Sequence, residues 1–224
     1  NNKEGVLMGR PPLTDEKKRD VTRNIIQATN ELIVNVGPEI PTIRKIADYA
    51  GVNLATLYKY FKDQDEIRLF ACVDTFKLYI NDLMHEGTQE QTPEGTYSMS
   101  WKLFCRYAFK YPEIINMLFF GPHSEDLSEV VRRYYELFPE QLEGMPECYQ
   151  GMLLNADLYR RNYEVLEPIL EGKADKARIE LINELTVLYF SMLLNERIKL
   201  ATDAKNDELT ERMMHTCTEL LKFV

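Results

Sequence analysis

The chain has 224 residues, of which 45% are hydrophobic and 28% are charged, and its formal net charge is -9. This composition is typical of a globular protein, and no apolar run approaches the roughly 18 residues that identify a membrane span. We therefore expect a soluble, cytoplasmic protein that does not enter a membrane. The acidity is uneven, because residues 1–70 carry 11 Lys and Arg against 10 Asp and Glu, and the remainder carries 16 against 26. The net charge of the whole chain therefore does not exclude a local binding surface for a nucleic acid in the N-terminal part.

Helical periodicity runs through nearly every long segment, and no two-residue alternation or hairpin signal indicates strands. We therefore expect an all-α protein. Thr14, followed by Asp15 and Glu16, predicts the start of a first helix. This helix should end near Val36, where the residues GPEIP follow.

The next segment has the pattern of a helix-turn-helix. Thr42 is a suitable cap for a short helix, and Gly51 permits the tight turn that follows it. Asn53 can cap a third helix in which Leu57 and Phe61 point inward. The residues expected on the inner face of the second helix are Ile43, Ile46, Ala47 and Ala50.

The outer face of the third helix carries little charge for a surface exposed to water. Small or apolar side chains near a helix start can lie against base edges in a DNA major groove, while lysine, tyrosine and threonine contact phosphates. Tyr58 or Tyr60 taken alone would more often be a half-buried packing residue, and Arg44 with Lys45 could simply be a solvated face. The joint pattern favours DNA binding. The residues of this outer face are Leu54, Ala55, Tyr58, Lys59 and Lys62.

A fourth helix should begin at Asp63, with Glu66 in the first turn, and continue to about Glu86. This length would let it belong to both halves of the molecule. From Thr92 onward, prolines and glycines divide the chain into about five or six helices of a bundle.

The segment TIRKIADYAGVNLATLYKYFKDQDEI, residues 42–67, resembles the DNA-binding signature of the TetR/AcrR family of bacterial transcriptional regulators. The resemblance covers about the first 75 residues. It implies an N-terminal arm (1–12), a three-helix DNA-binding domain (13–62) and a helical domain for effector binding and dimerisation (63–224), with about nine or ten helices in total. It further implies a homodimer that binds a palindromic operator in double-stranded DNA, acts most often as a repressor, and releases DNA when a small-molecule effector binds.

Site residues follow from the resemblance by position. Residues matching Thr42, Thr56, Tyr58 and Tyr60 contact the DNA backbone in this family, and those matching Leu54, Ala55 and Lys59 face the groove. Arg10 lies in an arm that resembles a minor-groove extension, and Lys62 should replace the family lysine at Gln64. The complete predicted set is Arg10, Thr42, Arg44, Asn53, Leu54, Ala55, Thr56, Tyr58, Lys59, Tyr60 and Lys62.

Two further sites are expected in the C-terminal part. Aromatic residues of the middle segment could form bundle core, and together they could line an apolar ligand pocket. The candidates are Trp101, Phe104, Tyr107, Phe119, His123, Tyr159 and Tyr163. The segment LTVLYFSMLL (185–194) is apolar almost all round, so it is either a deeply buried helix or a subunit interface; the resemblance favours the interface. Its candidates are Leu185, Leu188, Tyr189, Met192, Leu209, Met213, Cys217 and Leu220.

No enzyme signature is present. The three histidines lack a spacing that would place two metal ligands on one helix face, and there is no nucleophile elbow, Walker loop or dinucleotide fingerprint. We therefore expect neither an enzyme nor a bound metal or other cofactor. The four scattered cysteines are expected to be reduced, buried thiols. The alternative function is a helical small-molecule-binding protein or enzyme with a vestigial helix-turn-helix.

Overall fold

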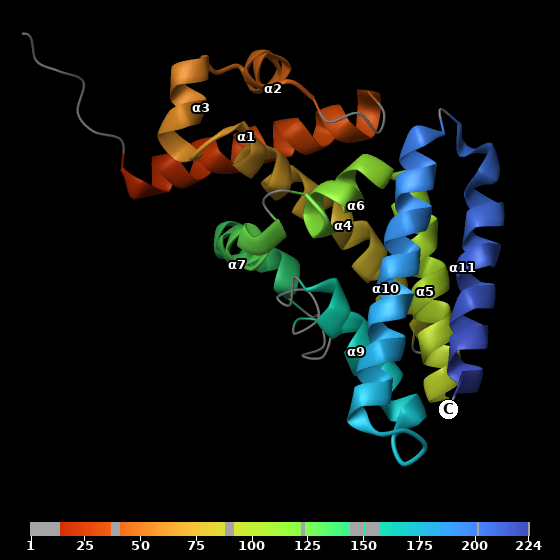
Figure 1. The fold of residues 1–224 in the computed structure, drawn as a ribbon. Helices are drawn as coiled ribbons and strands as arrows, with labels where there is room; N and C mark the ends of the chain where they lie inside the picture. Colours follow the sequence, from red (N-terminus) through yellow and green to blue (C-terminus); the bar gives the residue numbers. More distant parts are fainter. Residues whose placement is uncertain are drawn as a thin grey trace, which may run out of the picture.

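The computed structural model describes residues 14–36, 41–87, 92–121, 124–143, 150, 157–200 and 202–223, and within these ranges it contains helices and no strand (Figure 1). The all-α prediction is therefore confirmed. Arg10, His123 and Cys148 lie outside the described residues. The helices with described bounds are α1 (Asp15–Val36), α2 (Ile43–Ala50), α3 (Leu54–Tyr60), α4 (Gln64–Gly87), α5 (Pro93–Lys110), α6 (Pro112–Phe119), α7 (Leu127–Leu137), α9 (Leu158–Leu170), α10 (Lys176–Lys199) and α11 (Asn206–Leu220).

The first three helices form a separate layer at one end of the molecule, with α2 and α3 on the side of α1 that faces away from the bundle (Figure 1). On α1, Ile25, Ala28 and Leu32 are buried. They meet Ile46 from α2 and Leu57 from α3, which are fully buried. The inward faces predicted for α2 and α3 are confirmed, since Ile46, Ala47, Leu57 and Phe61 are buried, and Ile43 and Ala50 are half-buried.

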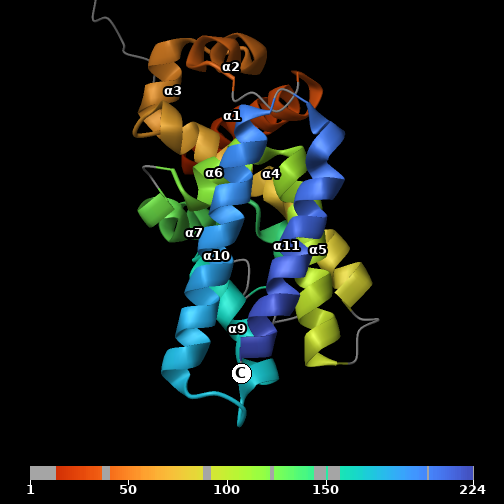
Figure 2. The same ribbon diagram turned by 45° about the vertical axis from the view of Figure 1, so that its right-hand side comes forward.

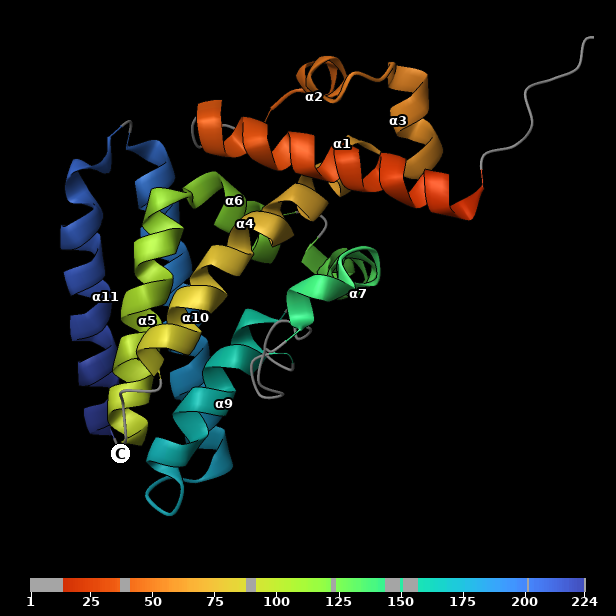
Figure 3. The same cartoon turned by 180° about the vertical axis from the view of Figure 1, so that it is seen from behind.

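Helix α4 joins this layer to the rest of the chain and runs diagonally from beneath α1 into the bundle (Figure 3). Its start is capped by Asp63, whose carboxylate accepts hydrogen bonds from the N–H groups of Asp65 and Glu66, both at 2.9 Å. Near this end Phe70 packs edge-to-face on Phe61, with ring centroids 5.7 Å apart. Further along, Ile80 is buried in the bundle. The prediction that α4 belongs to both halves is confirmed.

The C-terminal bundle is built around long helices, with α10 and α11 side by side along one face (Figure 2). Its centre is aromatic: Phe104 lies 5.0 Å from Phe190 and 5.7 Å from Trp101 between ring centroids. Cys72, Cys105 and Cys217 are buried free thiols, as predicted. Among the helices of the described ranges, none has the length and apolarity that crossing a bilayer requires.

Three of the four interface candidates on α11 lie in the interior of their own chain. Leu209, Met213 and Cys217 are buried because α11 packs on α5 and α10 of its own chain, so they are not available to a partner. An amphipathic stripe has the same spacing whether it covers its own core or another subunit. Tyr189 and Leu220 are half-buried, whereas Leu185, Leu188 and Met192 on α10 are exposed by 42%, 49% and 48%.

Candidate functional site

The turn between α2 and α3 is tight and depends on a glycine. Gly51 has φ 67° and ψ 30°, the left-handed region that other residues rarely adopt. Its N–H and that of Val52 donate to carbonyl oxygens at the end of α2, at 3.3 Å from Asp48 and 3.0 Å from Ala47. A Cβ at Gly51 would meet no atom within 4 Å, so the conformation and not the available space explains the glycine here.

Asn53 caps α3 as predicted. Its Oδ1 accepts hydrogen bonds from the Thr56 N–H at 2.8 Å and from the Thr56 hydroxyl at 3.0 Å. At the start of α2, Thr42 Oγ1 accepts from the Lys45 N–H at 3.4 Å. These caps satisfy backbone donors that would otherwise be unpaired, and they fix the direction in which α3 leaves the turn.

The outer surface of α3 is open to solvent. Leu54 and Tyr58 are 37% and 54% exposed, and Ala55 and Lys59 are also exposed. We call these four residues the recognition face. The opposite side is anchored, since Leu57 is fully buried. The recognition face therefore lies on a firmly held helix and is open to a partner.

The remaining predicted DNA contacts divide into exposed and half-buried residues. Arg44 of α2 and Lys62, which follows α3, are exposed. Thr56 and Tyr60 are half-buried, and Tyr60 packs against the core. The Thr56 hydroxyl already donates to Asn53, so a phosphate would have to compete for that proton.

Helix α7 connects the N-terminal helices to the bundle, which the sequence did not indicate. Arg133 of α7 pairs with Glu66 in the first turn of α4 and lies 5.2 Å from the Phe70 ring. Glu66 also accepts a hydrogen bond from the Lys62 N–H, directly after α3. One carboxylate therefore ties the end of the recognition helix to α7.

A second contact joins α1 to the end of α7. Arg23 donates to the Leu137 carbonyl at 2.7 Å, pairs with Glu140 and lies 4.5 Å from the centroid of the Phe138 ring. The hydrogen bond from Arg23 lowers the pKa of Glu140. The pair is partly exposed, so its contribution to stability is small.

The carboxylate of Asp74 on α4 interacts with three side chains. Its carboxylate accepts hydrogen bonds from Asn30 of α1 and from the Tyr134 hydroxyl of α7, and it pairs with Lys77 at 3.4 Å. Burial, together with Asp74, raises the pKa of Tyr134, which keeps the phenol protonated. The Tyr134 hydroxyl lies 2.9 Å from Gln141 Oε1 as well. This network links α1, α4 and α7.

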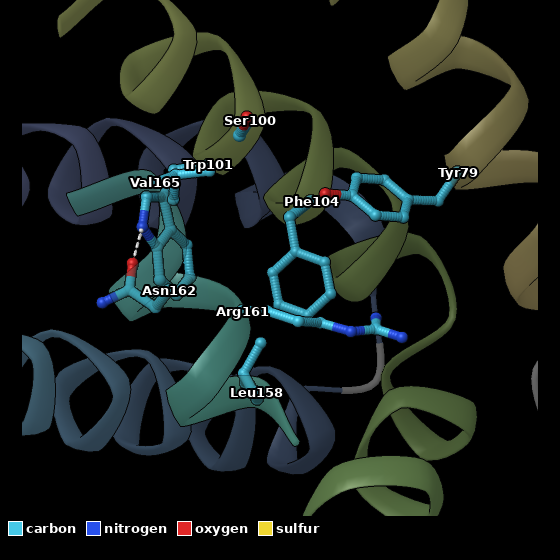
Figure 4. A pocket seen from close by; sticks show the side chains of 8 residues that line it. All are labelled: Tyr79, Ser100, Trp101, Phe104, Leu158, Arg161, Asn162 and Val165. Atoms are coloured by element: carbon cyan, nitrogen blue, oxygen red, sulfur yellow. Dashed lines mark hydrogen bonds between the residues drawn. The ribbon is translucent and has the colours of Figure 1, made fainter. Parts of the chain in front are cut away.

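A small cavity lies between α4, α5 and α9 (Figure 4), with a volume of about 40 Å³. Two predicted ligand residues, Trp101 and Phe104, line it. Trp101 Nε1 donates to Asn162 Oδ1 at 2.8 Å, so this indole is held by the protein. An adjoining space of about 10 Å³ is lined by Phe119, and Arg161 lines both spaces.

Three predicted ligand residues do not line these two spaces. The Tyr107 hydroxyl donates a hydrogen bond to the Asp82 carboxylate at 2.6 Å. Tyr159 and Tyr163 lie on sides of α9 that do not face these spaces, and the Tyr163 hydroxyl donates to the Glu167 carboxylate at 3.0 Å. Sequence reasoning missed Arg161, because a lone arginine in an amphipathic helix is usually on the surface. In the described part of the chain no group of three or more His, Cys, Asp or Glu is arranged to hold a metal ion.

Comparisons with known proteins agree with this geometry. The family model of bacterial regulatory proteins of the tetR family matches residues 25–69, which extend from α1 through the turn into α4. A protein of Haemophilus influenzae, described as an uncharacterized HTH-type transcriptional regulator, is 25% identical over 103 residues. The match covers 46% of this chain and 55% of that protein, so it spans about half the length of the relative.

Two solved structures align with most of the chain at low identity. One is described as a TetR-family transcriptional regulator from Mesorhizobium loti MAFF303099, with 16% identity, a TM-score of 0.48, and coverage of 92% of this chain and 98% of that one. The other is a TetR transcriptional regulator from Rhodococcus sp. RHA1, with 14% identity, a TM-score of 0.46, and coverage of 93% and 98%.

Proposed function

We propose that this chain, which belongs to the TetR family of bacterial regulatory proteins, is a DNA-binding transcriptional regulator and acts as a homodimeric repressor that binds a palindromic operator. We propose further that a small-molecule effector releases it from DNA. The observation that carries the DNA-binding proposal is the recognition face, an exposed and nearly uncharged surface on a helix fixed by Asn53 and Leu57.

The recognition face suits a major groove. Leu54 and Ala55 lie in the first turn of α3, where short apolar side chains can approach base edges and thymine methyl groups. Tyr58 and Lys59 lie one turn later, and their polar ends can reach phosphates or bases. Lys62 supplies a further phosphate contact just beyond the helix. We also propose that Arg10 contacts the adjacent minor groove, as the resemblance implies.

Dimerisation is proposed through α10. Leu181, Leu185, Leu188 and Met192, which we call the α10 strip, are each between 42% and 49% exposed. Their spacing of four, three and four residues places them on one side of the helix. Since an exposed apolar strip of this kind is costly in water, a second copy of α10 is a suitable cover. A two-fold axis there would place two α3 helices on half-sites about 34 to 36 Å apart.

Release by an effector is proposed to work through α4 and α7. The cavity between α4, α5 and α9 lies beside α4, and the Asp74 network and the Arg133–Glu66 pair connect these helices to α1 and to the end of α3. An effector can shift the two recognition helices only if it binds the two arrangements with different affinity.

Selection from a random pool of duplex DNA tests the function. The purified full chain should enrich a sequence with two-fold symmetry, and placing that sequence in a reporter promoter should lower transcription. Leu54→Lys should change the enriched sequence. Leu78→Lys is a matched control, because Leu78 is 40% exposed on α4 and lies outside the recognition face. Enrichment of no sequence at low salt, or of the same sequence for Leu54→Lys and the unchanged protein, would contradict the proposed face.

A further inference from the structure

Leu54 is an exposed hydrocarbon side chain at the start of the recognition helix. It is 37% exposed, and α3, the helix that carries it, lies on the side of α1 that faces away from the bundle (Figure 1). This helix is held from two sides, because Asn53 caps its first turn and Leu57 is fully buried. Leu54 therefore keeps its outward position when a partner approaches this side of the molecule.

The polar groups on either side of Leu54 are engaged in capping the helix. Asn53 Oδ1 accepts hydrogen bonds from the Thr56 N–H at 2.8 Å and from the Thr56 hydroxyl at 3.0 Å. The two residues between them, Leu54 and Ala55, are exposed and have hydrocarbon side chains. The start of α3 therefore offers DNA a hydrocarbon surface, and the polar ends of the recognition face begin one turn later.

Thymine is the one base of unmodified DNA that presents a methyl group in the major groove. The edges of adenine, guanine and cytosine present hydrogen-bond donors and acceptors there. A donor or acceptor covered by Leu54 would lose its water without gaining a partner, which costs free energy. A methyl group covered by Leu54 is removed from water, which is favourable. Leu54 therefore favours thymine at the position that it covers.

We infer that Leu54 is a specificity-determining residue, which contacts the C5 methyl group of a thymine at one position of each operator half-site. This inference rests on the proposed function and names the base that the start of the recognition face selects. Leu54 is the residue with the reach for this contact, because the side chain of Ala55 is a single carbon. Tyr58 and Lys59 have polar ends, which suit phosphates or base acceptors instead. Since the methyl group itself is recognised, 5-methylcytosine at this position should be preferred over cytosine.

The size of the effect follows from the burial of one methyl group. Removing a group of this size from water corresponds to about 4-fold in affinity. A homodimer on a symmetric operator makes the same contact in both half-sites. Loss of both methyl groups should therefore weaken binding by about 15-fold, which a direct affinity measurement can resolve.

Replacing thymine by deoxyuridine tests the inference, because uracil lacks the methyl group and keeps every hydrogen-bonding group. The duplex that the full chain enriches is synthesised with deoxyuridine at one symmetric pair of thymines at a time, and affinity is measured by fluorescence anisotropy. One pair should weaken binding by about 15-fold, and every other pair by less than about 3-fold. At the sensitive pair, 5-methylcytosine opposite guanine should bind more tightly than cytosine by a similar factor.

Substitutions at position 54 assign the effect to this side chain. Leu54→Ala places a good helix former at an exposed position, so the fold is retained, and it should reduce the effect of deoxyuridine to less than about 3-fold. Leu54→Met keeps a long apolar side chain and should retain the effect. Leu78→Ala is the matched control, because Leu78 is 40% exposed on α4 and lies outside the recognition face.

The outcomes separate this inference from the proposed function. If the full chain enriches a symmetric sequence in which no thymine pair responds to deoxyuridine, or whose half-sites lack thymine, Leu54 does not read a methyl group and the DNA-binding function stands. If the full effect of deoxyuridine persists in Leu54→Ala, it arises from the DNA or from another residue, and the role of Leu54 is wrong. If no sequence is enriched at low salt, the proposed function fails and this inference fails with it.

Discussion

Replacing Tyr134 by phenylalanine should destabilise the protein by removing one hydrogen bond from the Asp74 network. The Tyr134 hydroxyl is buried and donates to the Asp74 carboxylate, and hydrogen bonds to charged groups contribute about 1.5 to 3 kcal/mol. Since Asp74 keeps its contacts with Asn30 and Lys77, we expect the lower half of that range. The ring stays stacked on Phe138, 4.8 Å between centroids, so no cavity is created. For a chain of this size the melting temperature should fall by about 3 to 8 °C.

The neighbouring tyrosine provides the control. Tyr135 is also buried, but its hydroxyl finds no hydrogen-bond partner among the described residues. Tyr135→Phe should therefore leave stability unchanged or raise it by up to about 1 kcal/mol. The assay is thermal and urea unfolding of both variants at one protein concentration, because the proposed dimerisation would make the melting temperature depend on concentration. Equal destabilisation by the two substitutions would refute the argument, since it would mean that the Asp74 bond is not what distinguishes the hydroxyls.

Three further outcomes are expected. Lys62→Ala should reduce the slope of log affinity against log salt by about 0.9 for each phosphate that Lys62 neutralises, and a salt titration that matches the unchanged protein would remove Lys62 from the phosphate-binding residues. Leu188→Lys should convert the dimer to monomer in light scattering, whereas the same change at exposed Leu78 should not, and a dimer in both would place the interface elsewhere. With Cys148→Ser, the native protein should resist alkylation at neutral pH, because burial raises the pKa of Cys72 to about 12; rapid labelling would contradict this burial.

The local features of the N-terminal layer could be predicted from the sequence because each depends on neighbouring residues. Asn53 and Gly51 signal a cap and a left-handed turn through their own chemistry, and both are found as expected. The inward positions of α3 also follow from spacing alone, and Leu57 is buried.

Contacts between distant segments could not be predicted in this way. Asp74 and Tyr134 are 60 residues apart in the chain, and no sequence pattern links them. The apolar stripe of α11 was assigned to a partner, but Met213 is covered by α5 and α10 of the same chain. Arg161 was expected on the surface, as arginines usually are, but it is buried because of the helices that surround α9. In each case the local pattern was compatible with more than one neighbour.

Helix α4 has a consequence for how the protein unfolds. Ile67 and Phe70 near its start complete the core around Phe61, and Tyr79 and Ile80 further along belong to the core of the bundle. Because one continuous helix supplies both cores, neither can lose its packing without disturbing the other. The two parts should therefore melt in a single cooperative transition. A fragment cut directly before α4 would lack part of its own interior and should not remain folded.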